Sequence, residues 1–270
     1  MNTTDALLEV CRHTLDPFAT VIRYHDGHDG TRTLRAATYV GEAIVKIHRG
    51  RERHEQELHA YHHWTPLLGD LTARLLGTCD DPPAILVSAL PGRPLAELRV
   101  ATTAERDAHA QAGAILRTFH SAGPPRAEPN TVEWLVARGE AWLTVARDVI
   151  DSRRRATVRA HLRALGNLSP IAAVPCHLDF TPRNLLYGGD GTVRLIDFEH
   201  ARYDLAARDL VRLACRVWPS RPDLAEAFVR SYGPITDLER EVIEHWAHVD
   251  ELTRHARAHA CSYPARSTDR

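Results

Sequence analysis

The chain has 270 residues, of which 44% are hydrophobic and 26% charged, and its 34 basic and 35 acidic side chains leave a net charge of −1. This composition is typical of a globular protein and excludes a fibre or a largely disordered chain. The near-neutral charge argues against a nucleic-acid partner that depends on a broad basic surface. The five cysteines form no C-x-x-C pair, which predicts neither a disulfide framework nor a cysteine zinc site.

The sequence contains no run of about 18 apolar residues, the length expected of a membrane span. Its N-terminus also lacks the basic start and apolar stretch of a signal peptide. We therefore expect a soluble cytoplasmic protein without a membrane partner, present as a monomer or a homodimer.

The first 90 residues predict an antiparallel sheet of about five strands with one inserted helix. The turn sequences at 25–30 and 79–83 separate neighbouring strands. The expected elements are, in chain order, a helix over 4–15, strands over 18–24, 31–40 and 43–48, a helix over 51–67, and strands over 72–78 and 84–90.

The sequence Leu-Pro-Gly-Arg-Pro at 90–94 breaks this pattern, and we place a domain boundary there. Residues 1–90 form the first expected domain and residues 91–270 the second, which is mostly helical. Capping-box spacings at Thr102 to Glu105 and at Asn130 to Glu133 predict two helix starts. The expected helices cover 102–120, 130–150, 153–166, 205–217, 222–232 and 236–260.

One β-rich segment interrupts the helical half. After a short apolar strand at 173–177, the runs 185–187 and 192–196 flank the turn sequence Gly-Gly-Asp-Gly and predict a hairpin. With the turn centred near residues 189 and 190, Asn184 should lie across from about Leu195. Asn184 and Asp197 then meet at the open end of the hairpin.

These side chains have the chemistry that phosphoryl transfer requires. An amide oxygen and a carboxylate are hard ligands of the kind that Mg²⁺ prefers, so Asn184 and Asp197 predict a magnesium site. Asp179 precedes Asn184 by five residues and can return to the same place, where a carboxylate would orient an acceptor hydroxyl and take its proton.

Lys46 is the only lysine in the chain, because the other 33 basic residues are arginines. A position that keeps lysine in such a background can require a compact ammonium group rather than a planar guanidinium. Lys46 lies on the third expected strand, where kinases place the lysine that binds the nonreacting phosphates.

The motif His177-x-Asp179-x-x-Pro182-x-Asn184, followed by Leu-Ile-Asp-Phe-Glu at 195–199 and Arg-Asp-Leu at 208–210, resembles the aminoglycoside phosphotransferase and choline kinase-type family of small-molecule kinases. Pro-Gly-Arg-Pro-Leu at 91–95 matches the same family at the junction between lobes. The resemblance implies an α+β, bilobal, protein-kinase-like fold with a sheet-based N-lobe and a mostly helical C-lobe that carries the catalytic hairpin. It also implies ATP, with GTP not excluded, Mg²⁺, and a small-molecule hydroxyl acceptor.

The resemblance also implies roles for individual residues around the nucleotide. Asp179 would be the catalytic base, Asn184 and Asp197 the metal ligands, and Lys46 the phosphate contact. Glu57 would be the ion-pair partner of Lys46, with Glu55 as its competitor. Two further roles complete the nucleotide side: His177 and Asp209 would support the catalytic loop, and the backbone of Ser88, Ala89 and Leu90 would contact the base.

For the acceptor, the resemblance places the pocket among the C-terminal helices and the residues after Asp197. Four acidic residues there would suit a polyamine: Glu199, Asp204, Asp250 and Glu251. Only 11 residues separate Asp197 from Asp209, which favours a small acceptor over a protein. An antibiotic is the first expected acceptor, and the modification would give resistance by inactivating it.

Three alternatives stay open at this point. The enzyme could be a metabolic kinase of choline, homoserine or a sugar amine, or the fold could serve as a nucleotide-binding pseudokinase. The loop 24–31 has only two glycines three residues apart, so its phosphate contact is expected to be weak. The third alternative is a histidine-based metalloprotein, because the pairs His59/His63 and His255/His259 have a metal-ligand spacing, but each lacks a third ligand.

Overall fold

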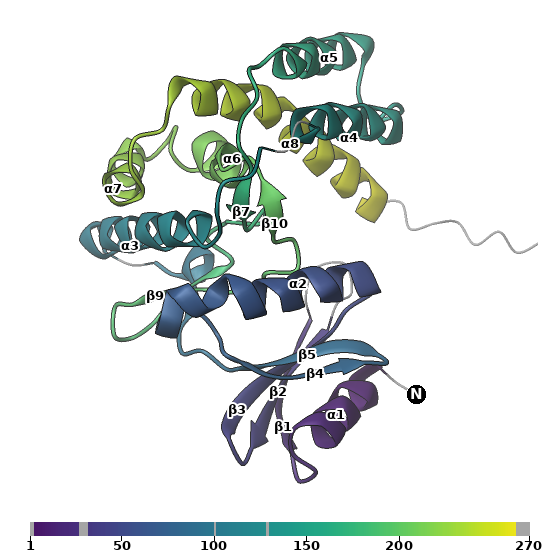
Figure 1. Cartoon of the computed structure of the whole chain (residues 1–270), viewed down its shortest axis with the longest axis vertical. Coiled ribbons are helices and arrows are strands. Elements are labelled where there is room, and N and C mark those ends of the chain that lie inside the picture. The colour runs from purple at the N-terminus through teal and green to yellow at the C-terminus, as the bar shows by residue number, and fades with distance from the viewer. Residues whose placement is uncertain (1–2, 27–31, 100, 128–129, 263–270) are drawn as a thin grey trace, which may run out of the picture.

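The computed structural model has two lobes, one built on a β-sheet and one mostly helical (Figure 1). The structure describes residues 3–26, 32–99, 101–127 and 130–262. Among these residues, no helix is long and apolar enough to cross a membrane. The expectation of an α+β fold with an antiparallel sheet followed by helices is confirmed.

The first lobe is an antiparallel sheet of five strands in the order β1-β2-β3-β5-β4, with a helix on each face (Figure 1). Leu34, Val45 and Leu86 on one face of the sheet pack against α1 in one apolar cluster. Because side chains alternate along a strand, Lys46 on β3 points to the opposite face, toward α2. The elements are α1 (Thr3–Thr14), β1 (Thr20–Asp26), β2 (Arg32–Thr38), β3 (Gly41–Ile47), α2 (Arg51–His63), β4 (Leu75–Asp80) and β5 (Pro83–Ser88).

The segment after α2 differs from its expected structure. The helix expected over 51–67 ends at His63, and a 3₁₀ helix follows over Thr65–Leu71. Pro66 explains the change, because proline has no N–H for an α-helical hydrogen bond and its ring clashes with the preceding turn. The next strand consequently begins at Leu75 rather than at residue 72.

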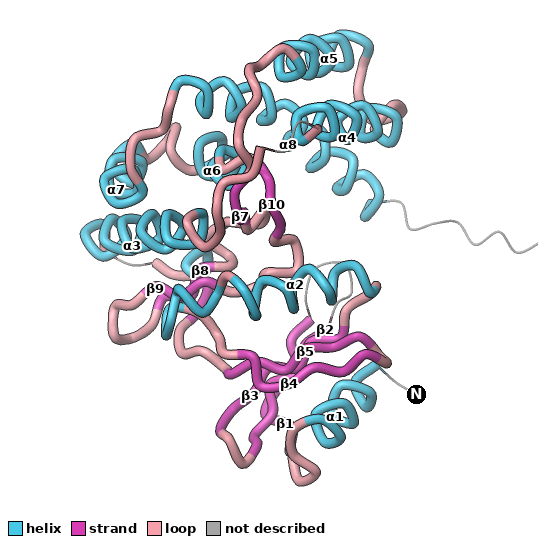
Figure 2. Tube along the Cα trace, viewed as in Figure 1, coloured by secondary structure: helices cyan, strands magenta, loops and turns pink. Residues whose placement is uncertain are grey.

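The second lobe consists of helices around two apolar clusters, with short strands at its junction with the first lobe (Figure 2). The expected helices and the expected hairpin are all present, whereas β6 and β10 were not predicted. The elements are β6 (Arg93–Pro94), a 3₁₀ helix (Leu95–Glu97), α3 (Thr102–His120), α4 (Thr131–Val145), α5 (Ser152–Gly166), β7 (Val174–Cys176), β8 (Leu185–Tyr187), β9 (Val193–Leu195), β10 (Arg202–Asp204), α6 (Ala207–Arg216), α7 (Pro222–Tyr232) and α8 (Asp237–Ser262).

The two expected capping boxes are wrong, although both helices begin close to the predicted residues. Neither α3 nor α4 has a side-chain cap, and Glu105 instead forms an ion pair with Arg221 at 2.6 Å. A reciprocal box does form before α8. The Thr236 N–H donates to Glu239 Oε2 at 2.7 Å, and the Glu239 N–H donates to Thr236 Oγ1 at 3.2 Å.

The two strands of the hairpin pair in a register that is shifted by one residue from the expected one. Leu185 pairs with Leu195, so Asn184 lies across from Ile196, whose N–H donates to the Asn184 carbonyl at 3.0 Å. The turn accommodates the extra residue because Gly191 adopts a φ of 73°. Asn184 and Asp197 still lie together at the open end of the hairpin.

The linker between the lobes is fixed to the same hairpin. β6 pairs with β8, so Arg93 lies opposite Tyr187. Gly92 has a φ of 114°, and a Cβ atom there would lie 2.8 Å from the Tyr187 carbonyl oxygen. Only glycine allows this close approach, which ties the junction of the lobes to the hairpin whose open end holds Asn184 and Asp197.

Candidate active site

The sole lysine lies at the centre of a charged cluster between the two lobes. Lys46 Nζ lies 3.0 Å from Glu57 Oε2, 2.5 Å from Asp197 Oδ1 and 2.8 Å from Glu199 Oε2. Burial alone would lower the pKa of Lys46, but the three carboxylates outweigh it and raise the pKa well above its usual value. The structure therefore brings Lys46 to Glu57, whereas Glu55 is exposed on another part of α2.

The charge of this cluster suits a divalent cation. Three carboxylates face one ammonium group, which leaves an excess of negative charge beside the hairpin. Asp197 also has a φ of 71°, a strained backbone conformation that aims its carboxylate at Lys46. Its other carboxylate oxygen and the side-chain oxygen of Asn184 are hard oxygen donors, the kind of group that divalent cations such as Ca²⁺ and Mg²⁺ prefer.

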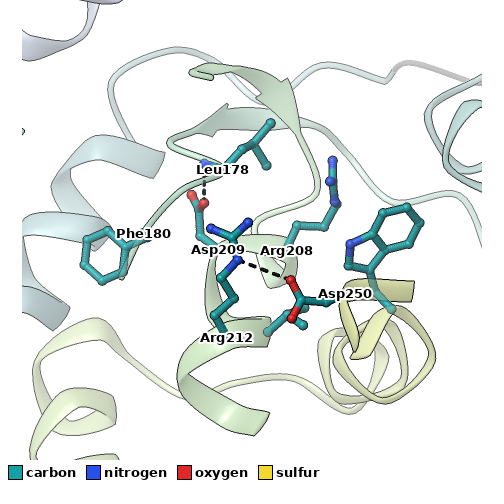
Figure 3. A pocket seen from close by; sticks show the side chains of 8 residues that line it. Leu178, Phe180, Arg208, Asp209, Arg212 and Asp250 are labelled. Atoms are coloured by element: carbon teal, nitrogen blue, oxygen red, sulfur yellow. Dashed lines mark hydrogen bonds and ion pairs between the residues drawn. The ribbon is translucent and has the colours of Figure 1, made fainter. Parts of the chain in front are cut away.

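A buried carboxylate on α6 holds the loop that begins at His177 and carries Asp179. Asp209 accepts hydrogen bonds from the backbone N–H groups of His177 at 2.7 Å and Leu178 at 2.5 Å. His120 Nε2 lies 3.0 Å from the same carboxylate. Leu178 has a φ of 61°, which its hydrogen bond to Asp209 stabilises (Figure 3).

Asp179 and Asn184 lie in direct contact. The Asn184 side-chain amide donates to Asp179 Oδ2 at 2.7 Å and to the Asp179 carbonyl at 2.9 Å. Its side-chain oxygen accepts no hydrogen bond from the described residues, which leaves it free to ligate a cation. His177 is fully buried and lies 3.0 Å from the Ile196 carbonyl, so it links the loop to the hairpin.

Phe198 connects this loop with the first lobe. Its ring is fully buried between Tyr61 of α2 and Phe119 of α3, with ring centroids 5.5 Å and 5.4 Å away. Its backbone N–H lies 3.3 Å from Glu57 Oε1, so one glutamate contacts both Lys46 and the segment after the hairpin. This contact couples the position of α2 to that of Asp197.

Arg212 is a site residue that the sequence analysis missed. Its guanidinium forms ion pairs with Asp179 Oδ1 and with Asp250 Oδ1, the latter at 3.2 Å (Figure 3). Burial lowers the pKa of Arg212, but the two carboxylates outweigh it and raise the pKa. The available signal was its place one helical turn after Asp209 on α6, which puts both residues on one face.

The four acidic residues expected to receive a polyamine do not form an acidic pocket, because each lies against a cation. Glu199 pairs with Lys46, and Glu251 pairs with Arg154. Asp204 is buried between Arg202 and Arg208, and Asp250 pairs with Arg212 and Arg216. The analysis of acidic residues alone did not include these cations, of which Lys46, Arg154, Arg212 and Arg216 come from other segments of the chain.

Part of the segment expected to contact the nucleotide base uses its backbone N–H groups for hydrogen bonds within the protein. The Ser88 N–H donates to the Arg74 carbonyl at 2.9 Å, and the Ala89 N–H donates to the Glu42 carbonyl at 2.8 Å. Leu90 is half-buried, and within the described residues its backbone groups make no hydrogen bond. Part of the loop expected to have weak phosphate contact, residues 27–31, lies outside the described residues.

The histidine pairs considered for a metal remain without a third ligand in the part of the chain that the structure describes. The rings of His59 and His63 lie 4.4 Å apart, and the His59 ring packs edge-on against Trp64 with the centroids 4.9 Å apart. Near the cleft, burial and the neighbouring Arg53 lower the pKa of His200 to about 4, so this imidazole is neutral at pH 7.

Several solved structures share this fold at low sequence identity. An aminoglycoside-3′-phosphotransferase of type VIII is 19% identical with a TM-score of 0.65, and the match covers 93% of this chain and 100% of that one. The macrolide 2′-phosphotransferase of Brachybacterium faecium is 16% identical with a TM-score of 0.65, covering 96% and 94%. Amicoumacin kinase in complex with AMP-PNP, Ca²⁺ and its antibiotic is 15% identical with a TM-score of 0.68, covering 100% and 90%.

The sequence comparison gives the family. No curated protein matches the chain. Residues 20–250, however, match the phosphotransferase enzyme family, and this range runs from β1 into α8. It contains the charged residues between the lobes: Lys46, Glu57, Asp179, Asp197, Glu199, Asp209 and Arg212. The chain therefore belongs to the phosphotransferase enzyme family and is a small-molecule kinase with a protein-kinase-like fold.

Proposed function

We propose that this enzyme transfers the γ-phosphoryl group of ATP to a hydroxyl group of a small molecule and requires Mg²⁺. The observation that carries the proposal is the contact of Lys46 with both Glu57 and Asp197. It joins the sheet, α2 and the hairpin around one ammonium group, the arrangement that positions nucleotide phosphates in kinases. The complex of the related amicoumacin kinase with AMP-PNP and Ca²⁺ supports the use of a nucleotide and a divalent cation.

Each residue of the cleft has a defined task in this reaction. Lys46 binds the nonreacting phosphates, and Glu57 holds the ammonium group in place. Asp179 accepts the proton of the acceptor hydroxyl and aims its oxygen, while the Asn184 amide fixes the carboxylate of Asp179. Asn184 and Asp197 would hold Mg²⁺, which would supply positive charge to neutralise the phosphate oxygens.

A hollow beside Asp179, open to solvent and lined by residues of both lobes, provides the place for the acceptor. Relatives that act on an aminoglycoside, a macrolide and amicoumacin make antibiotics the first acceptors to test. Inactivation of the antibiotic would then give resistance, and metabolic hydroxyl compounds form the second group of candidates.

The test is mass spectrometry of antibiotics and metabolic alcohols after incubation with the enzyme, ATP and Mg²⁺. We expect a phosphate adduct that disappears without Mg²⁺, and rates that fall at least about a hundredfold in Asp179→Ala and Asp197→Ala. Asp223→Asn, which changes a partly exposed ion pair on α7, serves as the control. Phosphorylation that continues unchanged in both alanine variants would refute the assigned roles.

A further inference from the structure

The hollow beside Asp179 is lined by guanidinium groups from both lobes. Arg53 comes from α2, and the helices and strand of the second lobe contribute the others. Two lining residues are acidic, Asp179 and Asp250. The six arginines that line this hollow are Arg53, Arg138, Arg202, Arg208, Arg212 and Arg257.

The acidic groups nearby are already neutralised. Arg212 pairs with both lining carboxylates, as Figure 3 shows for Asp250. Asp204 lies just behind the hollow and is shared by Arg202 and Arg208. Within the described ranges of the chain, the two carboxylates that line the hollow and that of Asp204 are therefore each paired with an arginine.

Three lining arginines have no carboxylate partner among the described residues. Arg53 donates to the Gln56 side chain at 3.1 Å and to the Glu199 carbonyl at 3.3 Å. Arg138 lies over the Trp134 ring at 5.3 Å, and Arg257 lies 5.7 Å from the Trp142 ring. These neutral contacts orient the guanidinium groups but do not cancel their charge.

The remaining positive charge is concentrated enough to affect its neighbours. Burial lowers the pKa of Arg138, and the nearby Arg202, Arg208 and Arg53 lower it further. Arg202, Arg208 and Arg212 are paired with carboxylates but mostly buried, with side-chain exposures of 26%, 10% and 26%, so solvent screens their effect on the unpaired arginines only in part. An anion between these groups would relieve their repulsion and could form bidentate hydrogen bonds with them.

We propose that the acceptor is an anionic hydroxyl compound, one that carries a carboxylate or phosphate group, and that Arg53, Arg138 and Arg257 bind this group. The inference rests on the proposed function, because it takes the hollow beside Asp179 as the acceptor site. Polyamines, including polycationic aminoglycosides, would meet like charges and are expected to be poor acceptors.

Four sugars that differ in one substituent test the charge preference directly: glucuronate, glucose 6-phosphate, glucose and glucosamine. Their binding is measured by ligand-observed NMR titration of the full chain with AMP-PNP and Mg²⁺ present, so that the nucleotide site is filled. We expect at least one anionic sugar to bind about tenfold more tightly than glucose and glucosamine. The two anions also separate carboxylate from phosphate recognition.

Substitution then assigns the preference to the hollow. Arg138→Gln should weaken binding of the preferred anion about tenfold, whereas Arg163→Gln, which removes the same charge from an exposed position on α5, should not. Equal binding of all four sugars, preference for glucosamine, no binding of either anion, or an unaltered affinity in Arg138→Gln would each overturn the inference. AMP-PNP binding, titrated separately in wild type and Lys46→Ala, tests the proposed function independently.

Discussion

Asp209→Asn is the substitution for which the structure gives the most definite expectation. The carboxylate is completely buried and accepts hydrogen bonds from the His177 and Leu178 backbones, with His120 Nε2 at 3.0 Å. An asparagine keeps one acceptor oxygen and turns an NH₂ group toward a donor. At least one buried hydrogen bond to a charged group is lost, and a buried N–H is left unpaired.

The magnitude follows from these losses. A hydrogen bond to a charged group contributes about 1.5–3 kcal/mol, and breaking a buried ionic contact from one side costs about 3–5 kcal/mol. We expect the free energy of unfolding to fall by about 3–4 kcal/mol and Tm by about 10 °C. Urea and thermal unfolding measure both, and Asp223→Asn, a partly exposed carboxylate paired with Arg221, should change stability by less than about 1 kcal/mol.

The same substitution should alter catalysis in a specific way. Because Asp209 fixes the left-handed conformation of Leu178, its loss displaces Asp179 without touching the nucleotide side of the cleft. We expect kcat to fall about 10- to 100-fold while KM for ATP changes less than about threefold. A stability loss with an unchanged kcat would refute the argument that Asp209 positions the catalytic loop.

The pH dependence provides an independent check. Burial alone would raise the pKa of Asp209, but the hydrogen bond from His120 and the other contacts outweigh it and lower the pKa. A carboxylate with a lowered pKa in the folded state stabilises the protein above its unfolded pKa of about 3.9, and this contribution disappears as pH falls through the folded pKa. The stability difference between wild type and Asp209→Asn should thus be constant at pH 6–8 and shrink below about pH 4.

Three further predictions concern other parts of the site. Lys46→Arg should lower kcat/KM for ATP at least about a hundredfold in initial-rate assays, because a planar guanidinium cannot replace a compact ammonium among three carboxylates. Asn184→Ala should raise the Mg²⁺ concentration for half-maximal activity at least about tenfold, measured by metal titration. Gly92→Ala should lower the free energy of unfolding, measured with urea, by about 2 kcal/mol. Gly189→Ala, where a Cβ meets no atom within 4 Å, should lower it by less.

The sequence predicted most of the architecture because its strongest signals are local. Short β-like runs bounded by turn sequences defined the strands, and the Gly-Gly-Asp-Gly turn identified the hairpin, with an error of one residue in its register. Local signals gave a wrong prediction where a contact with a distant segment of the chain took the place of the local one. Glu105 had the spacing of a capping box, but it pairs with Arg221 on a distant helix, since a bidentate-capable guanidinium competes well for a carboxylate.

The reactive centre was predictable for a different reason. Lys46, Asp179, Asn184 and Asp197 are separated by up to 151 positions, yet each lies on or beside a recognisable turn or strand that fixes its place. The positive φ at Leu178 could not be predicted, because leucine rarely adopts it, whereas aspartate adopts it more often, as Asp197 does here. Tertiary hydrogen bonds impose that conformation, and they involve Asp209 and Lys46 from other elements.

The acceptor site shows where counting charges along a sequence fails. The segment after Asp197 and the helix α8 contain several acidic residues, which favoured a cationic acceptor. In the folded protein Asp204, Asp250 and Glu251 are each paired with arginines, and further arginines from α2 and α4 enter the same space. The electrostatic character of a binding site is set by the charges that remain after pairing, so the proposal of an anionic acceptor could be made only from the assembled structure.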